Sequence, residues 1–293
     1  MTDYIKSPMN YTGGKYKLLE YIIPCFPESM NKFVDLFAGG LNVGINVQAD
    51  AIYANDQITY LIELYRLFQN TPIDLILEKI KDRIALFGLS QTNSEGYYAL
   101  RAEFNKSKSM IDLFLLTCYS FNHQIRFNSR HEFNISFGKE RSSFNNSIKT
   151  NLMQFCTALQ NKKIILSAAD FRDFDFTLLT KGDVVYCDPP YLLTTAPYND
   201  GKCGFKNWTE KDDSELMSLL DKLNERGVLF TMSNVFVHKG QINDALIEWS
   251  KKYKVIKLNK NYSNCSYHLK DRKAKTVEVL ITNQVCQIEN KLL

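Results

Sequence analysis

Hydrophobic and polar positions follow two different patterns along the chain. Short apolar runs, bounded by glycine, proline or acidic residues, are typical of buried strands and occur toward both ends of the sequence. The runs that predict strands are residues 33–37, 51–56, 162–167, 183–187, 227–233, 253–259 and 276–283. Helical spacing lies between several of them, near 211–225 and 240–251. Strands that alternate with helices predict an α/β domain around a parallel sheet.

The middle of the chain has helical spacing without strand-like runs. Segments with apolar residues every three or four positions are 58–68, 72–87, 94–106 and 110–121, and residues 122–147 are rich in Asn, Ser, Arg and Phe. We therefore expect residues 1–57 and 161–293 to form one catalytic α/β domain. Residues 58–160 are expected to form a mostly helical insertion with a basic, hairpin-like loop.

Composition allows a substantial core and gives a weak basic signal. The 293 residues are 45% hydrophobic and 13% aromatic, and 36 basic residues face 32 acidic ones, for a net charge of +4. The basic residues cluster between 251 and 275 and between 121 and 150. Such clusters attract polyanions, although a solvated lysine-rich face explains them equally well.

The termini and the cysteines indicate the cellular setting. The first ten residues lack the apolar core of a secretory signal, and no run of about 18 apolar residues could span a bilayer. The seven cysteines are odd in number, form no C-x-x-C pair and have no histidine at ligand spacing, which argues against structural zinc. We expect a reduced, soluble, cytoplasmic protein with no metal site and no membrane partner.

The segment DVVYCDPPYLL, residues 183–193, ends an apolar strand in an acid and two prolines. Pro189 and Pro190 cannot donate ladder hydrogen bonds, so the backbone leaves the sheet stiffly after Asp188 and turns its carbonyls outward. In an open α/β sheet, ligands bind at the carboxyl ends of the strands. A solvated turn is the simpler explanation of this segment taken alone.

Acids also follow two other predicted strands. Asp56 closes the run 51–56 and Asp170 follows the run 162–167, so with Asp188 they should line one edge of the sheet. Asp56 falls about 20 residues after Asp35, the spacing at which a carboxylate accepts ribose hydroxyls. A helix cap is the alternative role of Asp56.

Two glycine turns accompany these acids. Ala38, Gly39 and Gly40 join the first strand to an expected helix and depart from G-x-G-x-x-G, which disfavours a dinucleotide fold. Gly13 and Gly14 precede Lys15 and a helical pattern. Alone, this second turn indicates only a helix start with surface lysines.

In order, these segments resemble the motifs of the Dam-type DNA adenine-N6 methyltransferases, the D12 class, alpha group. The resemblance covers YTGGK at 11–15, DLFAGG at 35–40, ND at 55–56, DF at 170–171 and DPPY at 188–191. In this group the cofactor motif precedes a recognition insert, and the catalytic motif follows it. The resemblance implies a Rossmann-like sheet that binds S-adenosylmethionine.

The resemblance also assigns site residues. The catalytic set is Asp188, Pro189, Pro190 and Tyr191, with the Asp188 carboxylate and Pro189 carbonyl accepting the adenine amino hydrogens and Tyr191 stacking on the extruded base. The cofactor set is Tyr11, Gly13, Gly14, Lys15, Asp35, Phe37, Ala38, Gly39, Gly40, Asp56, Asp170, Phe171 and Asp188. Tyr11 replaces the family's common tryptophan, and FAGG shifts the glycines. Either departure could alter cofactor affinity.

Residues 118–139 resemble the asparagine-rich stretch of the family's insert. The resemblance implies that Arg126 reads a guanine, because a guanidinium donates to guanine O6 and N7 together. Arg130, Lys139 and Arg141 are expected on phosphates. The DNA-binding set is Asn122, Arg126, Asn128, Arg130, Lys139 and Arg141. A surface arginine without a DNA contact remains the alternative for each arginine.

The sequence therefore predicts a sequence-specific DNA adenine-N6 methyltransferase of a restriction–modification system. It would act on duplex DNA and share its site with a cognate restriction endonuclease. The alternatives are an RNA or protein-glutamine methyltransferase, for which NPPY is the commoner motif, and a non-catalytic nucleic-acid-binding protein of the same fold.

Overall fold

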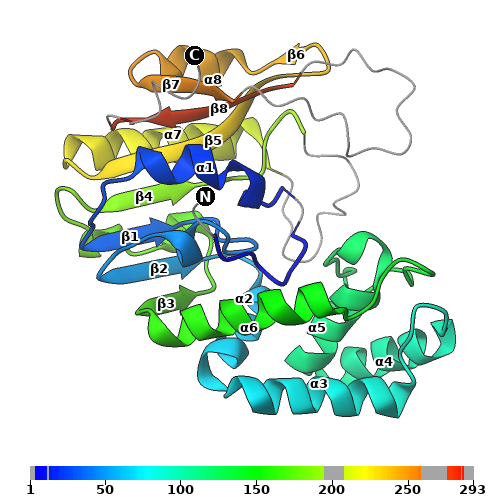
Figure 1. Ribbon diagram of the computed structural model, residues 1–293. Helices are drawn as coiled ribbons and strands as arrows, with labels where there is room; N and C mark the ends of the chain where they lie inside the picture. Colours follow the sequence, from blue (N-terminus) through cyan, green and yellow to red (C-terminus); the bar gives the residue numbers. More distant parts are fainter. Residues whose placement is uncertain (1–3, 12, 195–207, 259–275, 285, 287–293) are drawn as a thin grey trace.

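The computed structural model describes residues 4–11, 13–194, 208–258, 276–284 and 286. The described residues form an eight-stranded sheet in the order β3-β2-β1-β4-β5-β8-β7, with β6 paired to β5 (Figure 1). The strands are β1 (Lys32–Asp35), β2 (Ala51–Asn55), β3 (Ile164–Ser167), β4 (Val184–Cys187), β5 (Leu229–His238), β6 (Gln241–Ile242), β7 (Lys254–Leu258) and β8 (Val277–Thr282). All the apolar runs that predict strands are therefore confirmed as strands.

The first five strands of the sheet are parallel. β1 pairs with β2 and with β4, β2 pairs with β3, and β4 pairs with β5, all in parallel. From β1 the chain builds β2 and β3 on one side, and it later builds β4 and β5 on the other. The boundary between β1 and β4 is thus a topological switch point, where α/β sheets open a crevice for ligands.

Strand β8 runs opposite to the parallel strands, as the short β6 does. β8 is antiparallel to both β5 and β7, so it inserts in reverse between two strands that precede it in the chain. The apolar pattern of residues 276–283 identified the strand but could not give its direction, because a run buried on both faces looks the same either way.

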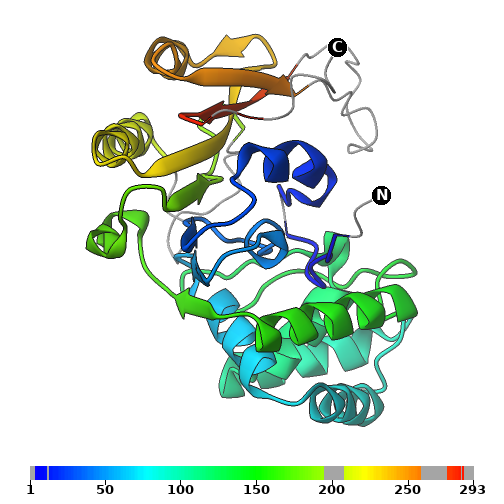
Figure 2. The same cartoon turned by 60° about the vertical axis from the view of Figure 1, so that its left-hand side comes forward.

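Helices cover both faces of the sheet. Figure 2 shows α1 (Leu19–Ile22) and α7 (Glu210–Glu225) on opposite sides of the strands. Alternate side chains of β4 enter different cores: Val184 and Tyr186 pack with α1, while Val185 and Cys187 pack with α7 and with α8 (Asp244–Ser250). This alternation follows from the two-residue period of a strand and explains why β4 is buried throughout.

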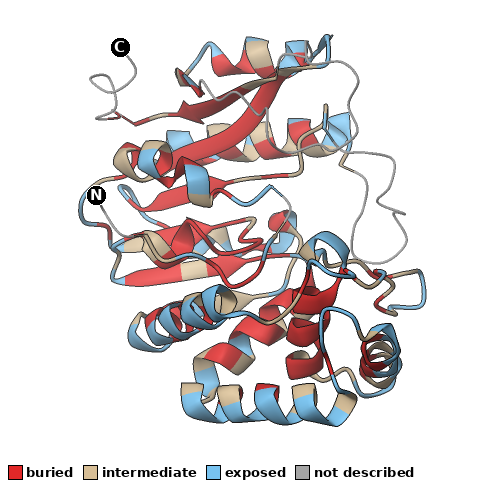
Figure 3. Cartoon of the chain, turned by 45° about the vertical axis from the view of Figure 1, so that its right-hand side comes forward, coloured by how far each residue is buried: buried red, intermediate tan, exposed pale blue. Residues whose placement is uncertain are grey.

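The central part of the chain forms a helical insertion at the β3 edge (Figure 1). Its helices are α2 (Thr59–Asn70), α3 (Ile73–Phe87), α4 (Ser94–Ser107), α5 (Met110–Tyr119) and α6 (Asn146–Asn161). Residues Ile111–Tyr119 of α5 are all buried, and the insertion shares one hydrophobic core with a face of the sheet. Figure 3 shows the strands buried almost throughout and the insertion helices exposing one side.

Helix α6 was not predicted from the sequence. Its first half is polar, but Asn145 caps it by accepting from the Ile148 N–H at 3.0 Å, and Leu152, Phe155 and Leu159 form a buried stripe. Tyr65 of α2 lies 5.6 Å from the Phe155 ring. Packing against α2 therefore stabilises a helix that the spacing of apolar residues did not predict.

The helix expected after the glycine turn at residues 38–40 is absent, so that prediction was wrong. Residues Gly44–Asn46 form a single 3-10 turn. A side chain at Gly44 would lie 2.9 Å from Leu41 and 3.0 Å from the Asp35 carboxylate, and Leu41 has a φ of 54°. The segment is thus folded tightly onto the end of β1 and leaves no room for a regular helix.

The loop between α5 and α6 is hairpin-like. Two antiparallel bridges, Ser120–Phe137 and Phe127–Phe133, hold its strands together. Its second strand is fixed to α4, because the Ile135 carbonyl accepts from the Tyr97 hydroxyl at 3.0 Å and from Arg101 at 3.2 Å. In the described ranges, no helix combines the length and the apolar character needed to cross a bilayer.

Candidate active site

The carboxyl ends of the parallel strands bring the predicted acids together. Asp35 ends β1, Asp56 and Asp170 follow β2 and β3, and Asp188 follows β4. Asp35 is close enough to Asp56 and Asp188 for their negative charges to raise its pKa. The acids of the three central strands therefore share one edge at the β1/β4 switch point.

The segment before α1 is fixed onto the glycine turn that follows β1, at residues 38–40. The Ser7 N–H donates to the Asn42 side chain at 3.1 Å, and the Ile5 N–H donates to Asn46 at 2.8 Å. Gly39 has a φ of 46°, and a methyl group on it would lie 3.0 Å from two ring carbons of Tyr11. Glycine is required at position 39 because the Tyr11 ring lies directly against the turn.

This arrangement places Lys15 beside Asp188. The Lys15 Nζ lies 2.8 Å from Asp188 Oδ1 and 3.9 Å from Glu278 Oε1. The Tyr191 hydroxyl donates to Asp188 Oδ1 at 2.9 Å and reaches Glu278 Oε1 at 3.2 Å. The Lys15 Nζ also sits 5.0 Å from the centre of the Tyr191 ring. We call these residues, Lys15, Asp188, Tyr191 and Glu278, the DPPY cluster.

Burial dominates the electrostatics of this edge. It raises the pKa of Asp188, while Lys15 and the Tyr191 hydroxyl lower it and the charge of Glu278 raises it further. Burial raises the pKa of Asp35 to about 7, against the lowering effect of the Gly44 N–H. Burial also raises the pKa of Asp56, which accepts from the Gly39 and Ile58 N–H groups at 2.9 Å each. Asp188 and Glu278 share Lys15, and Asp35 and Asp56 add further buried carboxyl groups nearby, which favours a cationic ligand.

The end of β3 carries an aromatic surface. The Phe171 ring lies 5.5 Å from Phe37 and 5.6 Å from Trp208, and these last two lie 5.7 Å apart. The rings come from three separate parts of the chain and meet at the same edge as the acids. Such a surface suits a flat heterocycle, because stacked aromatic rings attract each other.

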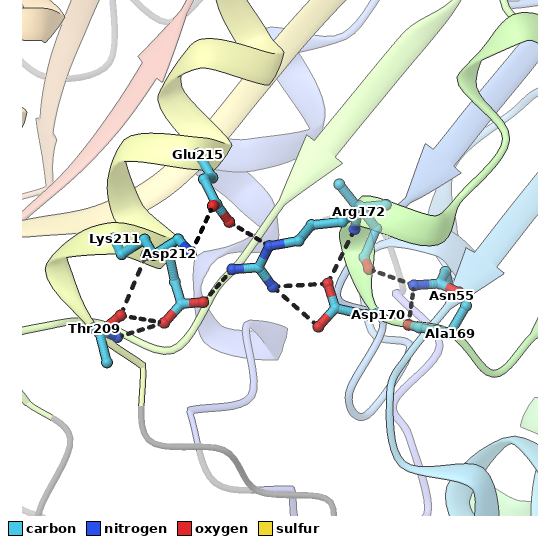
Figure 4. A network of polar contacts seen from close by, with 9 residues as sticks. Asn55, Ala169, Asp170, Arg172, Thr209, Lys211, Asp212 and Glu215 are labelled. Carbon is cyan, nitrogen blue, oxygen red and sulfur yellow. Dashed lines mark hydrogen bonds and ion pairs between the residues drawn. The ribbon is translucent and has the colours of Figure 1, made fainter.

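Asp170 is held in an ion-pair network that joins β3 to α7 (Figure 4). Arg172 Nη1 lies 2.9 Å and 3.0 Å from the two Asp170 oxygens, and the same guanidinium binds Asp212 and Glu215 of α7. Asp170 also accepts from the Arg172 N–H at 3.1 Å. The network fixes the start of α7, and with it Trp208, relative to the sheet edge.

The predicted DNA-binding residues occupy the hairpin-like loop. Arg126 is half-buried and its Nε donates to Asn134 at 2.8 Å. Asn128 acts inside the loop, because its Oδ1 accepts from the Arg130 and Glu132 N–H groups. Arg130 and Lys139 are 78% and 71% exposed, Arg141 lies 5.9 Å from the Phe121 ring, and Asn122 is exposed with a φ of 56°.

Sequence analysis missed Glu278, Trp208 and Arg172. Glu278 could have been found, since it is the one acid in the apolar run VEVLIT. Trp208 and Arg172 gave no local signal, because their roles depend on α7 meeting β3. Of the basic stretch 251–275, residues 259–275 lie outside the described part, and Lys251 and Lys252 pair with Glu248 and Asp221. Among described residues, no group of His, Cys, Asp and Glu has an arrangement that could hold a metal ion.

A mostly parallel sheet with β8 reversed between β5 and β7, a glycine turn after β1 and acids at the β1/β4 switch point define a Rossmann-like methyltransferase fold. The family model of the D12 class N6 adenine-specific DNA methyltransferases matches residues 11–264, and the chain belongs to this family. The predicted family is therefore confirmed.

Individual relatives of the chain are also methyltransferases or methylases by name. The chain is 48% identical over 281 residues to the type II methyltransferase M.FokI of Planomicrobium okeanokoites, covering 96% of this chain and 43% of that protein. It is 44% identical over 291 residues to the modification methylase StsI of Streptococcus sanguinis, covering 99% and 44%. The DNA adenine methylase of Escherichia coli K12 is 28% identical over 264 residues, covering 87% and 88%. The chain spans less than half the length of the first two relatives.

Proposed function

We propose that this chain is a sequence-specific DNA adenine-N6 methyltransferase that uses S-adenosylmethionine and belongs to a restriction–modification system. The observation that carries the proposal is the position of the Asp188-Pro189-Pro190-Tyr191 segment. It leaves β4 at the switch point, next to the acids and the aromatic surface, within a chain of the adenine-specific family.

The target amino group would be held by two fixed acceptors. Adenine N6 is a weak nucleophile because its lone pair is delocalised into the ring. The Asp188 carboxylate and the Pro189 carbonyl would each accept one N–H, which favours a more tetrahedral nitrogen. Burial of Asp188 strengthens it as an acceptor, and Pro189 and Pro190 keep both acceptors rigid, so little reorganisation is needed during reaction.

The residues at the strand ends fit the cofactor. When bound, S-adenosylmethionine supplies a methyl carbon on a positively charged sulfur, which keeps the bonding electron pair as the methyl group leaves. The crowded acids suit that positive charge, and Asp56 retains lone pairs for ribose hydroxyls beyond its two backbone hydrogen bonds. The Phe37, Phe171 and Trp208 rings would contact the cofactor's adenine.

The hairpin-like loop would contact duplex DNA. Arg130, Lys139 and Arg141 are exposed cations suited to phosphates, and Arg126 is held by Asn134 with its guanidinium half-exposed for a guanine edge. Asn122 lies on the same loop, and Asn10 of the segment before α1 donates to its carbonyl at 3.4 Å. This contact links the DNA-binding loop to the cofactor side of the site.

The proposed activity and the relatives' names support a cellular setting for the enzyme. The enzyme would act in the cytoplasm on double-stranded DNA, and a cognate restriction endonuclease would share its recognition site. Modification methylases and type II methyltransferases among the relatives support this setting.

The experiment is a transfer assay with tritiated S-adenosylmethionine and unmethylated plasmid DNA, followed by nucleoside analysis. We expect label in N6-methyladenine and none in cytosine. Asp188→Ala should abolish transfer while DNA retention in a gel shift stays within about threefold, because Asp188 acts on the extruded base rather than on the duplex. Label in cytosine, or no label on any DNA, would reject the proposal.

A further inference from the structure

Glu278 is a buried acid in β8, an interior strand of the sheet whose other residues are apolar or hydroxylic. Residues 278–282 of β8 are all buried, and Glu278 is 4% exposed. Burying a carboxylate is costly unless ion pairs or hydrogen bonds compensate. The β5–β8 pairing also shifts register between Val235 and Val237, beside the position opposite Glu278, and such bulges occur often next to active sites.

The Tyr191 hydroxyl has two carboxylates within reach. It lies 2.9 Å from Asp188 Oδ1 and 3.2 Å from Glu278 Oε1. The tyrosine hydroxyl has a single hydrogen, so it can donate fully to only one of the two carboxylates at a time. The hydrogen can therefore point to either carboxylate, and a second donor on one of them weakens its hold on the hydroxyl.

Asp188 Oδ1 already accepts from a second donor. The Lys15 Nζ lies 2.8 Å from the same oxygen, so with the Tyr191 hydroxyl its two lone pairs are both engaged. An amino N–H that approaches this oxygen, rather than Oδ2, would have to displace one of these donors. Lys15 carries a charge and has the shorter contact, so the neutral hydroxyl is the easier donor to move.

We propose that Glu278 is a positioning residue that receives the Tyr191 hydroxyl when the target base enters, and so frees Asp188 Oδ1 for the amino group. The inference rests on the proposed function and deepens it. Tyr191 would keep its ring in place and rotate only its hydroxyl hydrogen from Asp188 to Glu278. Lys15, 3.9 Å from Glu278 Oε1 and 2.8 Å from Asp188 Oδ1, would stay between the two carboxylates.

The first test compares substitutions at Glu278 in the full chain. Glu278→Ala should lower kcat by about 10- to 100-fold, the range for losing a hydrogen bond to a charged acceptor, with little change in the KM for plasmid DNA. Glu278→Gln keeps an acceptor oxygen and should recover most of that loss. Glu28→Gln, at an exposed glutamate outside the DPPY cluster, is the matched control.

A double-mutant cycle separates positioning from a structural role. Tyr191→Phe keeps the ring and removes the hydroxyl. If Glu278 acts through that hydroxyl, Glu278→Ala should cost less than about threefold in kcat in the Tyr191→Phe background, because coupled residues are not additive. Equal costs in both backgrounds would overturn the proposal.

A readout without turnover distinguishes failure of this inference from failure of the proposed function. Asp188 is titrated by carbon-13 NMR of labelled aspartate in the free protein, with its signal assigned by Asp188→Asn. The charge of Glu278 raises the pKa of Asp188, so Glu278→Gln should lower that pKa. The titratable and charged groups around Asp188 are Lys15, Tyr191, Glu278, Tyr186, Asp35, Tyr11 and Cys187.

The outcomes are distinct. A lower Asp188 pKa with a kcat loss that Gln restores supports the inference. An unchanged Asp188 pKa in Glu278→Gln refutes it even if the wild-type chain methylates adenine. If Glu278→Ala fails to fold, the Asp188 pKa in Glu278→Gln still decides. Absence of adenine methylation by the wild type would reject the proposed function instead.

Discussion

Replacing Gly39 with alanine tests the close approach of the Tyr11 ring to the first glycine turn. Gly39 has a φ of 46°, and the added methyl would lie 3.0 Å from two Tyr11 ring carbons. The left-handed backbone alone costs a non-glycine residue about 1–2 kcal/mol. The overpacked ring adds about 1–3 kcal/mol unless Tyr11 moves. We expect Gly39→Ala to lose about 2–4 kcal/mol of unfolding free energy, with part of the strain relieved by displacing Tyr11.

Gly88→Ala is the matched control. Gly88 ends α3 with a similar φ of 57°, and its added methyl would meet only the end of the Asn93 side chain, at 3.2 Å. Urea unfolding measures both variants, and calorimetry with S-adenosylmethionine measures cofactor affinity. Gly88→Ala should lose about 1–2 kcal/mol and keep its affinity, whereas Gly39→Ala should bind the cofactor about tenfold more weakly.

Combining Gly39→Ala with Tyr11→Ala should restore part of the lost stability, because the clash is removed. The reasoning is refuted if the two glycine variants lose equal stability and both bind the cofactor within twofold of wild type. It is also refuted if Tyr11→Ala and Gly39→Ala are simply additive.

Three further predictions rest on other contacts. Arg172→Gln should weaken cofactor binding severalfold in calorimetry, because Asp170 and the start of α7 lose their common partner. Lys211→Gln is the control: its contact with Glu215 is an exposed pair at 3.6 Å, so cofactor binding should not change measurably. Asp112→Ala should cost about 3–5 kcal/mol in urea unfolding, because Arg83 loses its bidentate partner at 2.7 Å and 2.5 Å; a loss under about 1 kcal/mol would contradict this. Asp35 binds its proton more tightly in the folded state, where its pKa is about 7, than in the unfolded state, where it is near 4. The free energy of unfolding should therefore fall as the pH rises from about 4 to 7. Asp35→Asn should remove that decline in pH-dependent unfolding, and an unchanged slope would show that Asp35 is not its source.

The order of motifs along the chain was sufficient to predict the family. Strands with apolar interiors, acids at their ends and glycine turns are local features, and each is set by the residues within a few positions. The DPPY segment is the strongest example, because two prolines fix the backbone of Asp188 and Tyr191 wherever the strand lies.

Elements that depend on a partner were less predictable. α6 begins in a polar segment and gains its stability by burying Leu152 and Phe155 against α2. The turn after β1 looked like the start of a helix, but contacts of Asn42 and Asn46 with the segment before α1 hold it as a 3-10 turn. Local propensity is a weak guide wherever such tertiary contacts compete with it.

The sequence by itself determined the chemical groups at the strand ends and the order in which they occur. Only the tertiary structure decided that β8 runs in reverse beside β5, and this direction brings Glu278 to within 3.2 Å of the Tyr191 hydroxyl. It likewise decided that Arg172 meets α7. The physical reason is that a strand pattern records which residues are buried, whereas the direction of a strand and the partners of a buried charge depend on residues distant in the chain.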